Sequence, residues 1–185
     1  METQRFVDKV ALVTGGANGL GRGMAEQLAK EGAQVVVFDI EDDTMEEAFA
    51  DNPRVRCMHC DVRDYEQVQK SVAEVIDEFG RIDVLMNNAG ITHRQDFLSC
   101  SQEGWLDVLD TNLSGVFYVG QAVARTMVDG GVEGHIVNTS SNSARKTIAG
   151  ITPYGPSKAA VSMLTQVMAL ELAKYGIHVN AVAPG

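Results

Sequence analysis

Near its N-terminus the chain carries the stretch Val10-Ala-Leu-Val-Thr-Gly-Gly-Ala-Asn-Gly-Leu-Gly-Arg-Gly23. Its first four residues form a short apolar run, which is typical of a strand buried on both faces. From Leu20 the apolar residues recur at Met24 and Leu28, the spacing of one face of a helix. The glycines therefore lie between a buried strand and the first turn of a helix. At such a turn the backbone N–H groups and the helix dipole attract a diphosphate, and residues without Cβ let it approach closely.

The next apolar run supports a nucleotide site. Residues 34–38 read as a second strand, which ends in Asp39 about twenty residues after the glycines, where a carboxylate would meet a ribose hydroxyl. A glycine-rich turn alone can also be a plain tight turn, and the spacing Gly15-x-x-x-Gly19-x-Gly21 departs from G-x-G-x-x-G. No Gly-Lys-Ser/Thr follows, which disfavours a P-loop.

The composition limits the class of protein. A length of 185 residues suggests a single domain, residues 1–185, with 45% hydrophobic and 22% charged residues. The net charge of −10 argues against broad contact with nucleic acid or an anionic membrane. No apolar run has the length of a membrane span, and the N-terminus lacks the apolar stretch of a signal peptide. We therefore expect a cytoplasmic protein.

Cys57 and Cys60 form a C-x-x-C pair, which could indicate zinc or redox chemistry. The segment reads as a strand, however, where residues three apart point to opposite faces. A four-ligand zinc site also lacks further ligands, because the only other cysteine, Cys100, has no second pair near it. We predict buried or half-buried thiols and no metal site.

Strands and helices alternate along the chain. Buried strands are predicted at 10–13, 34–38, 54–60, 82–86, 135–140 and 177–183. Parallel pairing with right-handed crossovers then gives an α/β fold, a doubly wound parallel sheet in three layers (αβα) with strand order 3-2-1-4-5-6. Ligands bind beyond the carboxyl ends of such strands. The polar segments 14–21, 87–90 and 140–141 and the side chain of Asp39 are expected to meet there.

The helix boundaries and faces are predicted from caps and periodicity. Ser101 is expected to cap a long helix whose buried side includes Phe117, and Asn112 falls within that apolar stripe. A buried amide there needs hydrogen-bond partners, either backbone neighbours or groups in a site. Met163 and Val167 are expected on the buried side of the last helix.

Tyr154 and Lys158 are four residues apart on that last helix, so they share one face. A free tyrosine ionises near pH ~10, and a neighbouring ammonium favours its phenolate by charge attraction. Tyr154 could then accept a proton from an alcohol or donate one to a ketone. Ser141 could hydrogen-bond the same substrate oxygen, and Lys158 could both hold a ribose and stabilise the phenolate. Alone, such a tyrosine–lysine pair is a weak signal.

In combination these residues resemble the compact type of the short-chain dehydrogenase/reductase family. The matches span nearly the whole chain in the family's order: Thr14–Gly21, Asp61-Val62, Asn87–Gly90, Asn112, Ser140-Ser141, Tyr154-Gly-Pro-Ser-Lys158 and Pro184-Gly185. The resemblance implies an oxidoreductase that moves a hydride between a nicotinamide dinucleotide and a secondary alcohol or ketone. It also implies a homodimer or homotetramer.

The resemblance implies the roles of individual residues. The predicted cofactor contacts are Gly15, Asn18, Gly19, Leu20, Asp39, Ile40, Asp61, Val62, Asn88, Ala89, Gly90, Tyr154, Lys158, Pro184 and Gly185. The predicted catalytic residues are Asn112, Ser141, Tyr154 and Lys158, of which Ser141 and Tyr154 also bind substrate. In the family, the residue matching Asn112 kinks its helix and holds a water that links the lysine to solvent.

Asp39 predicts NAD as the cofactor. A carboxylate accepts hydrogen bonds from two ribose hydroxyls but repels a 2′-phosphate. Neither Ala17 nor Asn18 offers a compensating cation, and Arg22 could do so only by turning back toward the ribose.

The sequence departs from the family after Gly185. Family members continue past this motif with nicotinamide contacts, a substrate-covering segment and a seventh strand, so the resemblance implies that the 185 residues are either a fragment or a sequence given without its remainder. We expect the 185-residue chain alone to be poorly active and prone to associate through its edge strand. Alternative interpretations are a non-catalytic NAD-binding protein, or a nucleotide-sugar epimerase or dehydratase of related fold. A methyltransferase shares the glycine turn, but its chemistry does not require Ser141, Tyr154 and Lys158 together.

Overall fold

The computed structural model describes residues 4–185, which fold around a six-stranded parallel sheet in the order β3-β2-β1-β4-β5-β6. The strands are β1 (Val10–Thr14), β2 (Gln34–Asp39), β3 (Val55–His59), β4 (Val84–Asn87), β5 (His135–Thr139) and β6 (His178–Val182). The order confirms the predicted doubly wound sheet. Because β1 pairs with both β2 and β4, the order reverses at β1, and the loop after β1 lies at the point where ligands bind in such sheets.

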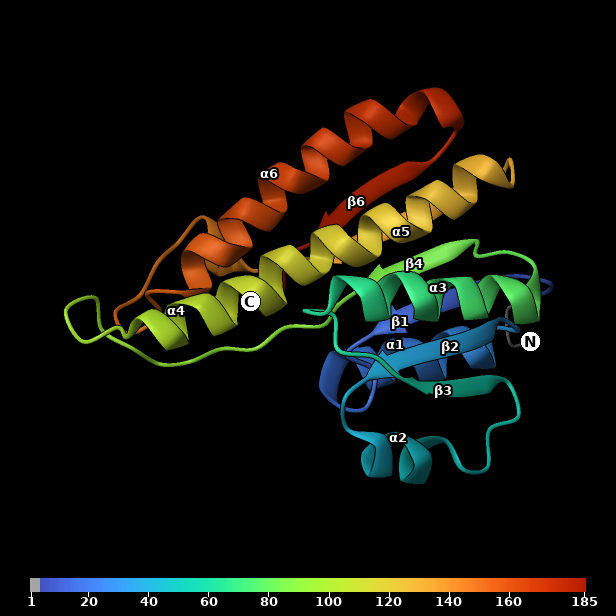
Figure 1. Ribbon diagram of the computed structural model, residues 1–185, viewed down its shortest axis with the longest axis horizontal. Helices are drawn as coiled ribbons and strands as arrows, with labels where there is room; N and C mark the ends of the chain where they lie inside the picture. The colour runs from blue at the N-terminus through green and yellow to red at the C-terminus, as the bar shows by residue number, and fades with distance from the viewer. Residues whose placement is uncertain (1–3) are drawn as a thin grey trace.

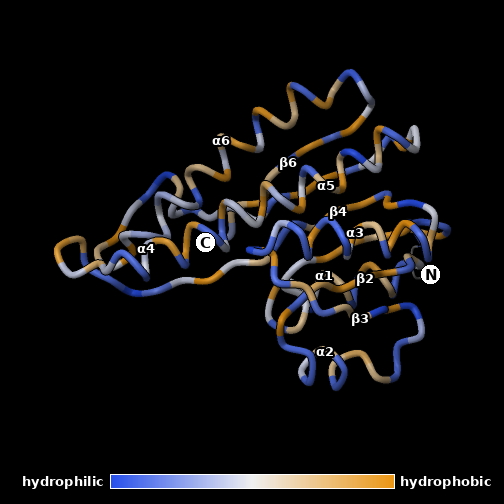
Figure 2. Tube along the Cα trace, in the orientation of Figure 1, coloured by the Kyte–Doolittle hydropathy of each residue, from blue (hydrophilic) through white to orange (hydrophobic). Residues whose placement is uncertain are grey.

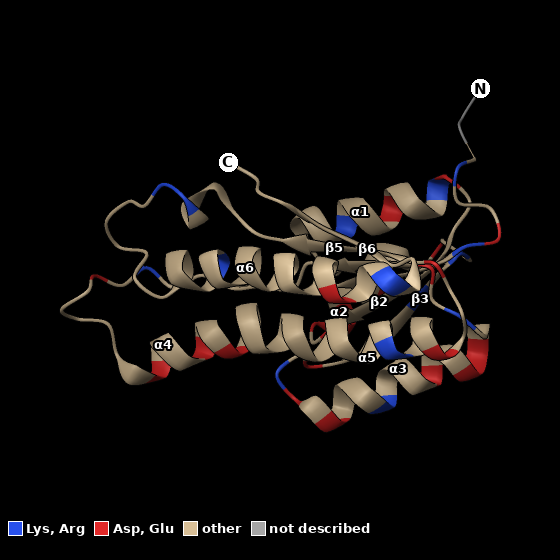
Figure 3. Cartoon of the chain, turned by 90° about the horizontal axis from the view of Figure 1, so that it is seen from above, with Lys and Arg blue, Asp and Glu red and all other residues tan. Residues whose placement is uncertain are grey.

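Helices cover both faces of the sheet (Figure 1). They are α1 (Gly19–Lys30), α2 (Asp42–Phe49), α3 (Tyr65–Phe79), α4 (Gln102–Leu109), α5 (Gly115–Asp129) and α6 (Tyr154–Leu172). Figure 3 shows α1 on one side of the sheet and α3, α5 and α6 on the other. No helix in the described range 4–185 is long and apolar enough to cross a membrane.

The core follows from the alternation of side chains along the buried strands. Leu12, Val36 and Phe38 pack with α3 and α5, whereas Val13 and Val37, one position along, pack with α1 and α2. Apolar residues accordingly dominate β2 and β4 in Figure 2. The rigid centre of the sheet therefore fixes where each strand ends, and with it the positions of the loops that follow.

The long helix predicted after Ser101 is not a regular α-helix throughout, because it changes to a π-helical turn around Asn112, the predicted buried amide. Ser101 caps α4 as predicted, because its hydroxyl accepts a hydrogen bond of 3.0 Å from the Gly104 N–H. A π-helical turn (Asp110–Ser114) then joins α4 to α5 without a break in the chain of helical residues. Such turns insert one extra residue per turn and are frequent at functional sites.

Two expectations about the helix faces were wrong. Phe117 on α5 is 42% exposed and Met163 on α6 is 59% exposed, and Val167 is exposed as well. Periodicity groups these apolar residues on one stripe, but the sheet contacts only part of that stripe. Phe117 and Val167 line a shallow groove between α5 and α6 on the outer side of the helical layer instead.

The glycine loop, residues 14–21 from the end of β1 into the first turn of α1, is packed so closely that some of its positions have no room for a side chain. A Cβ on Gly15 would lie 2.7 Å from the Ala89 Cα, and φ is +64° there. A Cβ on Gly21 would overlap the Gly15 carbonyl oxygen and lie 2.6 Å from the Asn88 Nδ2. The start of α1 is thus packed against both the loop before it and the segment after β4.

We expect Gly21→Ala to lower the free energy of unfolding by about 2 kcal/mol or more, because the overlap is with backbone that moves only with the whole loop. Equilibrium unfolding in urea measures this difference. Gly23→Ala is the matched control on the same helix, since a Cβ there meets no atom within 4 Å. Alanine favours a helix over glycine by about 1 kcal/mol, so the control should be neutral or stabilising. Equal effects of the two substitutions would contradict the packing argument.

Candidate active site

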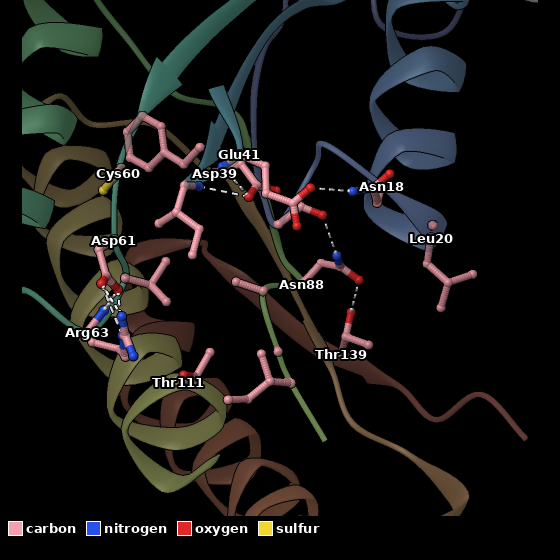
Figure 4. Close-up of a pocket in the computed structure, with 18 of the residues that line it drawn as sticks. Asn18, Leu20, Asp39, Glu41, Cys60, Asp61, Arg63, Asn88, Thr111 and Thr139 are labelled. Atoms are coloured by element: carbon pink, nitrogen blue, oxygen red, sulfur yellow. Dashed lines mark hydrogen bonds and ion pairs between the residues drawn. The ribbon is translucent and has the colours of Figure 1, made fainter. Parts of the chain in front are cut away.

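A cavity of about 610 Å³ lies at the carboxyl ends of the strands (Figure 4). It is bounded by the loop between β1 and α1, by the ends of β2, β3 and β4, and by the start of α6. Most of the predicted site residues line it: Gly15, Asn18, Gly19, Leu20, Asp39, Ile40, Asp61, Val62, Asn88, Ala89, Gly90, Tyr154 and Lys158. The fold therefore brings the predicted cofactor segments and the tyrosine–lysine pair into one space.

The loops around β1 are tied together by the buried hydroxyl of Thr14. Its Oγ1 accepts hydrogen bonds from the N–H groups of Asn88 and Ala89, at 2.9 and 3.0 Å. The Asn88 side-chain amide donates to the carbonyls of Thr14 and Gly15, both at 3.2 Å, and its Oδ1 accepts from Thr139 Oγ1 at 3.2 Å. One amide therefore joins the loops after β1, β4 and β5 at the floor of the cavity.

Asp39, at the end of β2, presents a carboxylate that backbone donors hold in place. Its Oδ2 accepts from the Ala17 N–H at 2.9 Å, and its Oδ1 accepts from the Ile40 and Glu41 N–H groups at 2.8 and 3.2 Å. The carboxylate thus also fixes the glycine loop opposite it. This contact explains why the predicted ribose-binding residue and the predicted diphosphate-binding loop lie side by side.

A second charged cluster, which the sequence reasoning did not identify, lines the wall near Asp61. Arg63 donates to the Asp61 carboxylate at 2.6–3.0 Å and to Asp107 Oδ1 on α4 at 2.9 Å. Its hydrogen bonds hold the pKa of Asp61 below the ordinary value, against the opposing effect of burial. His93 Nε2 lies 2.7 Å from Asp107 Oδ2. No spacing rule could join Arg63 to Asp107, because the two are 44 residues apart in the sequence.

Asn112 lies in the π-helical turn and is fully buried. Its Oδ1 accepts from the Ile91 N–H at 2.8 Å, and its Nδ2 donates to the Ile91 carbonyl at 2.9 Å and to Ser157 Oγ at 3.1 Å. It does not line the cavity. It fixes the chain that leaves β4 against the first turn of α6, beside the tyrosine–lysine pair.

Tyr154 and Lys158 occupy the first turns of α6 and both face the cavity. The Lys158 Nζ lies 5.7 Å from the centre of the Tyr154 ring and donates to the Thr139 carbonyl at 2.8 Å. Lys158 is only 3% exposed, and burial lowers the pKa of its ammonium to about 8. A Cβ on Gly90 would lie 3.1 Å from Asn112 Oδ1 and 3.2 Å from Lys158 Nζ, so a glycine lets the backbone pass close to both groups.

Three other predicted residues lie outside the cavity lining. Ser141 is buried, and its Oγ accepts from the Ser143 N–H at 3.1 Å, which caps a short turn at residues 142–144. The Pro184 carbonyl accepts from the Asn142 N–H at 3.0 Å, and Gly185 follows it. Their predicted contacts with substrate and cofactor stay predictions. His93, which the sequence places near the substrate pocket, also lines the cavity. So do residues that the sequence analysis did not assign to the site: Phe38, Glu41, Cys60, Arg63, Ile91, Asp107, Thr111 and Thr139.

Comparison with known proteins agrees with this geometry. The family model described as short chain dehydrogenase matches residues 9–185. A sorbitol dehydrogenase of Cereibacter sphaeroides is 38% identical over 182 residues, which are 98% of this chain and 71% of that protein. An NAD-dependent glycerol dehydrogenase of Listeria innocua is 38% identical over 97% of this chain and 70% of its own length.

Solved structures show the same likeness. The structure of an NAD⁺-bound xylitol dehydrogenase superposes with a TM-score of 0.94 at 37% identity, covering 98% of this chain and 71% of that one. The chain belongs to the short-chain dehydrogenase family and is therefore an oxidoreductase. This confirms the resemblance drawn from the sequence motifs.

Proposed function

We propose that the protein transfers a hydride between NAD(H) and a secondary alcohol or its ketone, and that the alcohol is a polyol. The observation that carries the proposal is that Tyr154 and Lys158 share one cavity with the glycine loop and Asp39. Relatives named for sorbitol, galactitol and glycerol suggest the substrate class. We further propose that residues 1–185 act as one dinucleotide-binding and catalytic domain.

The residues present fit a dinucleotide. Asn18 leaves the first turn of α1 without a side-chain cap, so backbone N–H groups remain available for a diphosphate at the cavity. A Cβ on Gly19 would meet no atom within 4 Å, which leaves that side of the loop open. Asp39 would accept hydrogen bonds from the adenosine ribose, and Asp61 and Val62 would flank the adenine. Asn88, Ala89 and Gly90 would support the middle of the cofactor.

Bound NAD would supply the acceptor for the hydride that leaves the carbinol carbon. The Tyr154 phenolate would take the hydroxyl proton of the alcohol, so that the C–O bond becomes a carbonyl as the C–H bond breaks. The Lys158 ammonium would favour the phenolate by charge attraction. We assign Ser141 to the substrate oxygen and Asn112 to positioning, in keeping with the sequence prediction.

Asp39 leads us to expect that NADH binds at least about tenfold more tightly than NADPH, because a 2′-phosphate would meet a fixed carboxylate. Arg22 does not compensate, since its Nε pairs with Glu26 Oε1 at 2.8 Å. Isothermal titration of each reduced cofactor measures the ratio, and equal affinities would contradict the role given to Asp39.

The proposed reaction is tested by following NADH formation from NAD⁺ with a panel of polyols and simple secondary alcohols. We expect stoichiometric NADH and ketone from at least one polyol. An epimerase or dehydratase would return its cofactor to the starting state and release no net NADH. A non-catalytic protein would bind NADH and oxidise none of the alcohols. Either result would overturn the proposal.

A further inference from the structure

The glycine loop, residues 14–21, is held by a second carboxylate, which belongs to Glu41 at the start of an acidic run of the sequence. Glu41 follows β2 by two residues and lines the same cavity as Asp39. Its Oε2 accepts a hydrogen bond of 2.8 Å from the Asn18 side-chain amide. Figure 4 shows these two side chains joined across the edge of the cavity, with Asp39 beside them.

A further contact keeps the Glu41 carboxylate in this position. The Thr44 hydroxyl, on the first turn of α2, donates to the same Oε2 at 3.2 Å. The Asp39 carboxylate accepts a hydrogen bond from the Ala17 N–H, and the Glu41 carboxylate accepts one from the side-chain amide of the next residue, Asn18. Two carboxylates at and just after the end of β2 therefore bind adjacent residues of the glycine loop. Both carboxylates lie beside the glycine loop, at the end of the cavity where the proposed function places the adenosine ribose.

Positive charge at this end does not offset the two carboxylates. The arginine and lysine side chains among the described residues lining the cavity are Arg63 and Lys158. Arg63 is occupied by Asp61 and Asp107, and Lys158 is buried against Thr139 beside the catalytic tyrosine. A phosphate added at the ribose would thus meet two fixed negative charges and no unpaired guanidinium from these residues.

We propose that Glu41 is a second determinant of cofactor choice, which works with Asp39 to exclude a 2′-phosphate and fixes Asn18 through its hydrogen bond. The inference rests on the proposed use of NAD. It assigns to Glu41 a specificity role toward the 2′ position that is separate from the hydrogen bonds that Asp39 offers to the ribose hydroxyls.

Glu41→Gln separates charge from structure, because the amide oxygen still accepts from Asn18 and Thr44 while the negative charge is lost. The matched control is Glu47→Gln, which removes the same charge from an exposed position of α2 outside the cavity. The probes are ADP-ribose and 2′-phospho-ADP-ribose, titrated by calorimetry, since these report the adenosine end without the nicotinamide half. NADH and NADPH are titrated in parallel.

We expect Glu41→Gln to lower the dissociation constant of 2′-phospho-ADP-ribose at least about fivefold, because repulsion by one nearby charge is removed. The dissociation constant of ADP-ribose should change by less than about twofold. Glu47→Gln should move neither value by more than about twofold, since exposed charges farther away are screened. An unchanged ratio in Glu41→Gln, or the same change in both variants, would overturn the inference while leaving the proposed function intact. Failure of the unsubstituted protein to bind ADP-ribose and NADH would instead overturn the proposed function.

Discussion

Tyr154→Phe is expected to lower kcat/KM for polyol oxidation by about a thousandfold, the scale of a lost general base. The substitution removes one oxygen from a residue on the first turn of α6, whose ring packs near the buried Lys158. Helix and cavity should therefore survive it. We expect the dissociation constant for NADH to stay within about threefold of the original value, because only the hydroxyl of one of the many proposed cofactor contacts is lost.

Steady-state kinetics with NAD⁺ and the best polyol, together with calorimetric titration of NADH, measure the two quantities separately. Tyr175→Phe is the matched control, because it makes the same chemical change on a tyrosine outside the cavity. If Tyr154→Phe kept its turnover, the phenol would have no part in proton transfer. If both activity and NADH binding disappeared, the residue would be structural.

The sequence predicted the parts of this site that depend on local spacing. The glycine turn between β1 and α1, the carboxylate at the end of β2 and the tyrosine–lysine pair one helical turn apart all follow from the period of strands and helices. The order of the sheet then follows from crossover handedness, which brings these segments to one edge. These features were predictable because each is set within a few residues, or by a general rule of topology.

Contacts between distant segments were not predictable in this way. Glu41 reads as one acid in a run of acids, and only the fold shows that it reaches Asn18. The Arg63–Asp107 pair joins the loop between β3 and α3 to α4, and no spacing rule relates these two segments. Met163 shows the opposite error: its period is correct for a helix, but the period does not say which part of a wide apolar stripe the sheet covers.

Lys158→Met is expected to make the protein more stable near neutral pH and almost inactive. Burial lowers the pKa of Lys158 to about 8 in the folded protein, from an ordinary value of 10.5. Below about pH 8 the folded chain must bury a charged ammonium. The lowering of the pKa from 10.5 to about 8 corresponds to a cost of about 3 kcal/mol for burying the charged form instead of the neutral amine. Methionine carries no such charge and has a similar length.

The gain in the free energy of unfolding from Lys158→Met will be smaller than this burial cost, because the Thr139 carbonyl loses the hydrogen bond of 2.8 Å that Lys158 donates to it. A lost bond of this kind offsets about 1 to 2 kcal/mol. We therefore expect Lys158→Met to raise the free energy of unfolding by about 1 to 2 kcal/mol at pH 6.5, measured by urea unfolding. Activity should fall because the phenolate of Tyr154 loses its nearby cation.

The pH dependence of the free energy of unfolding gives the sharper test. Its sign follows from the lowered pKa of Lys158 in the folded protein. Between pH 8 and 10.5 the unfolded chain keeps the Lys158 proton while the folded chain releases it, so this residue makes the original protein more stable as the pH rises. The advantage of Lys158→Met should then shrink over this range and reverse near pH 10, where the lost hydrogen bond dominates. Lys70→Met, at an exposed site on α3, should show no such trend. If the difference in the free energy of unfolding between Lys158→Met and the original protein stayed constant from pH 6.5 to 10, burial of the charged amine beside the tyrosine would carry no free-energy cost.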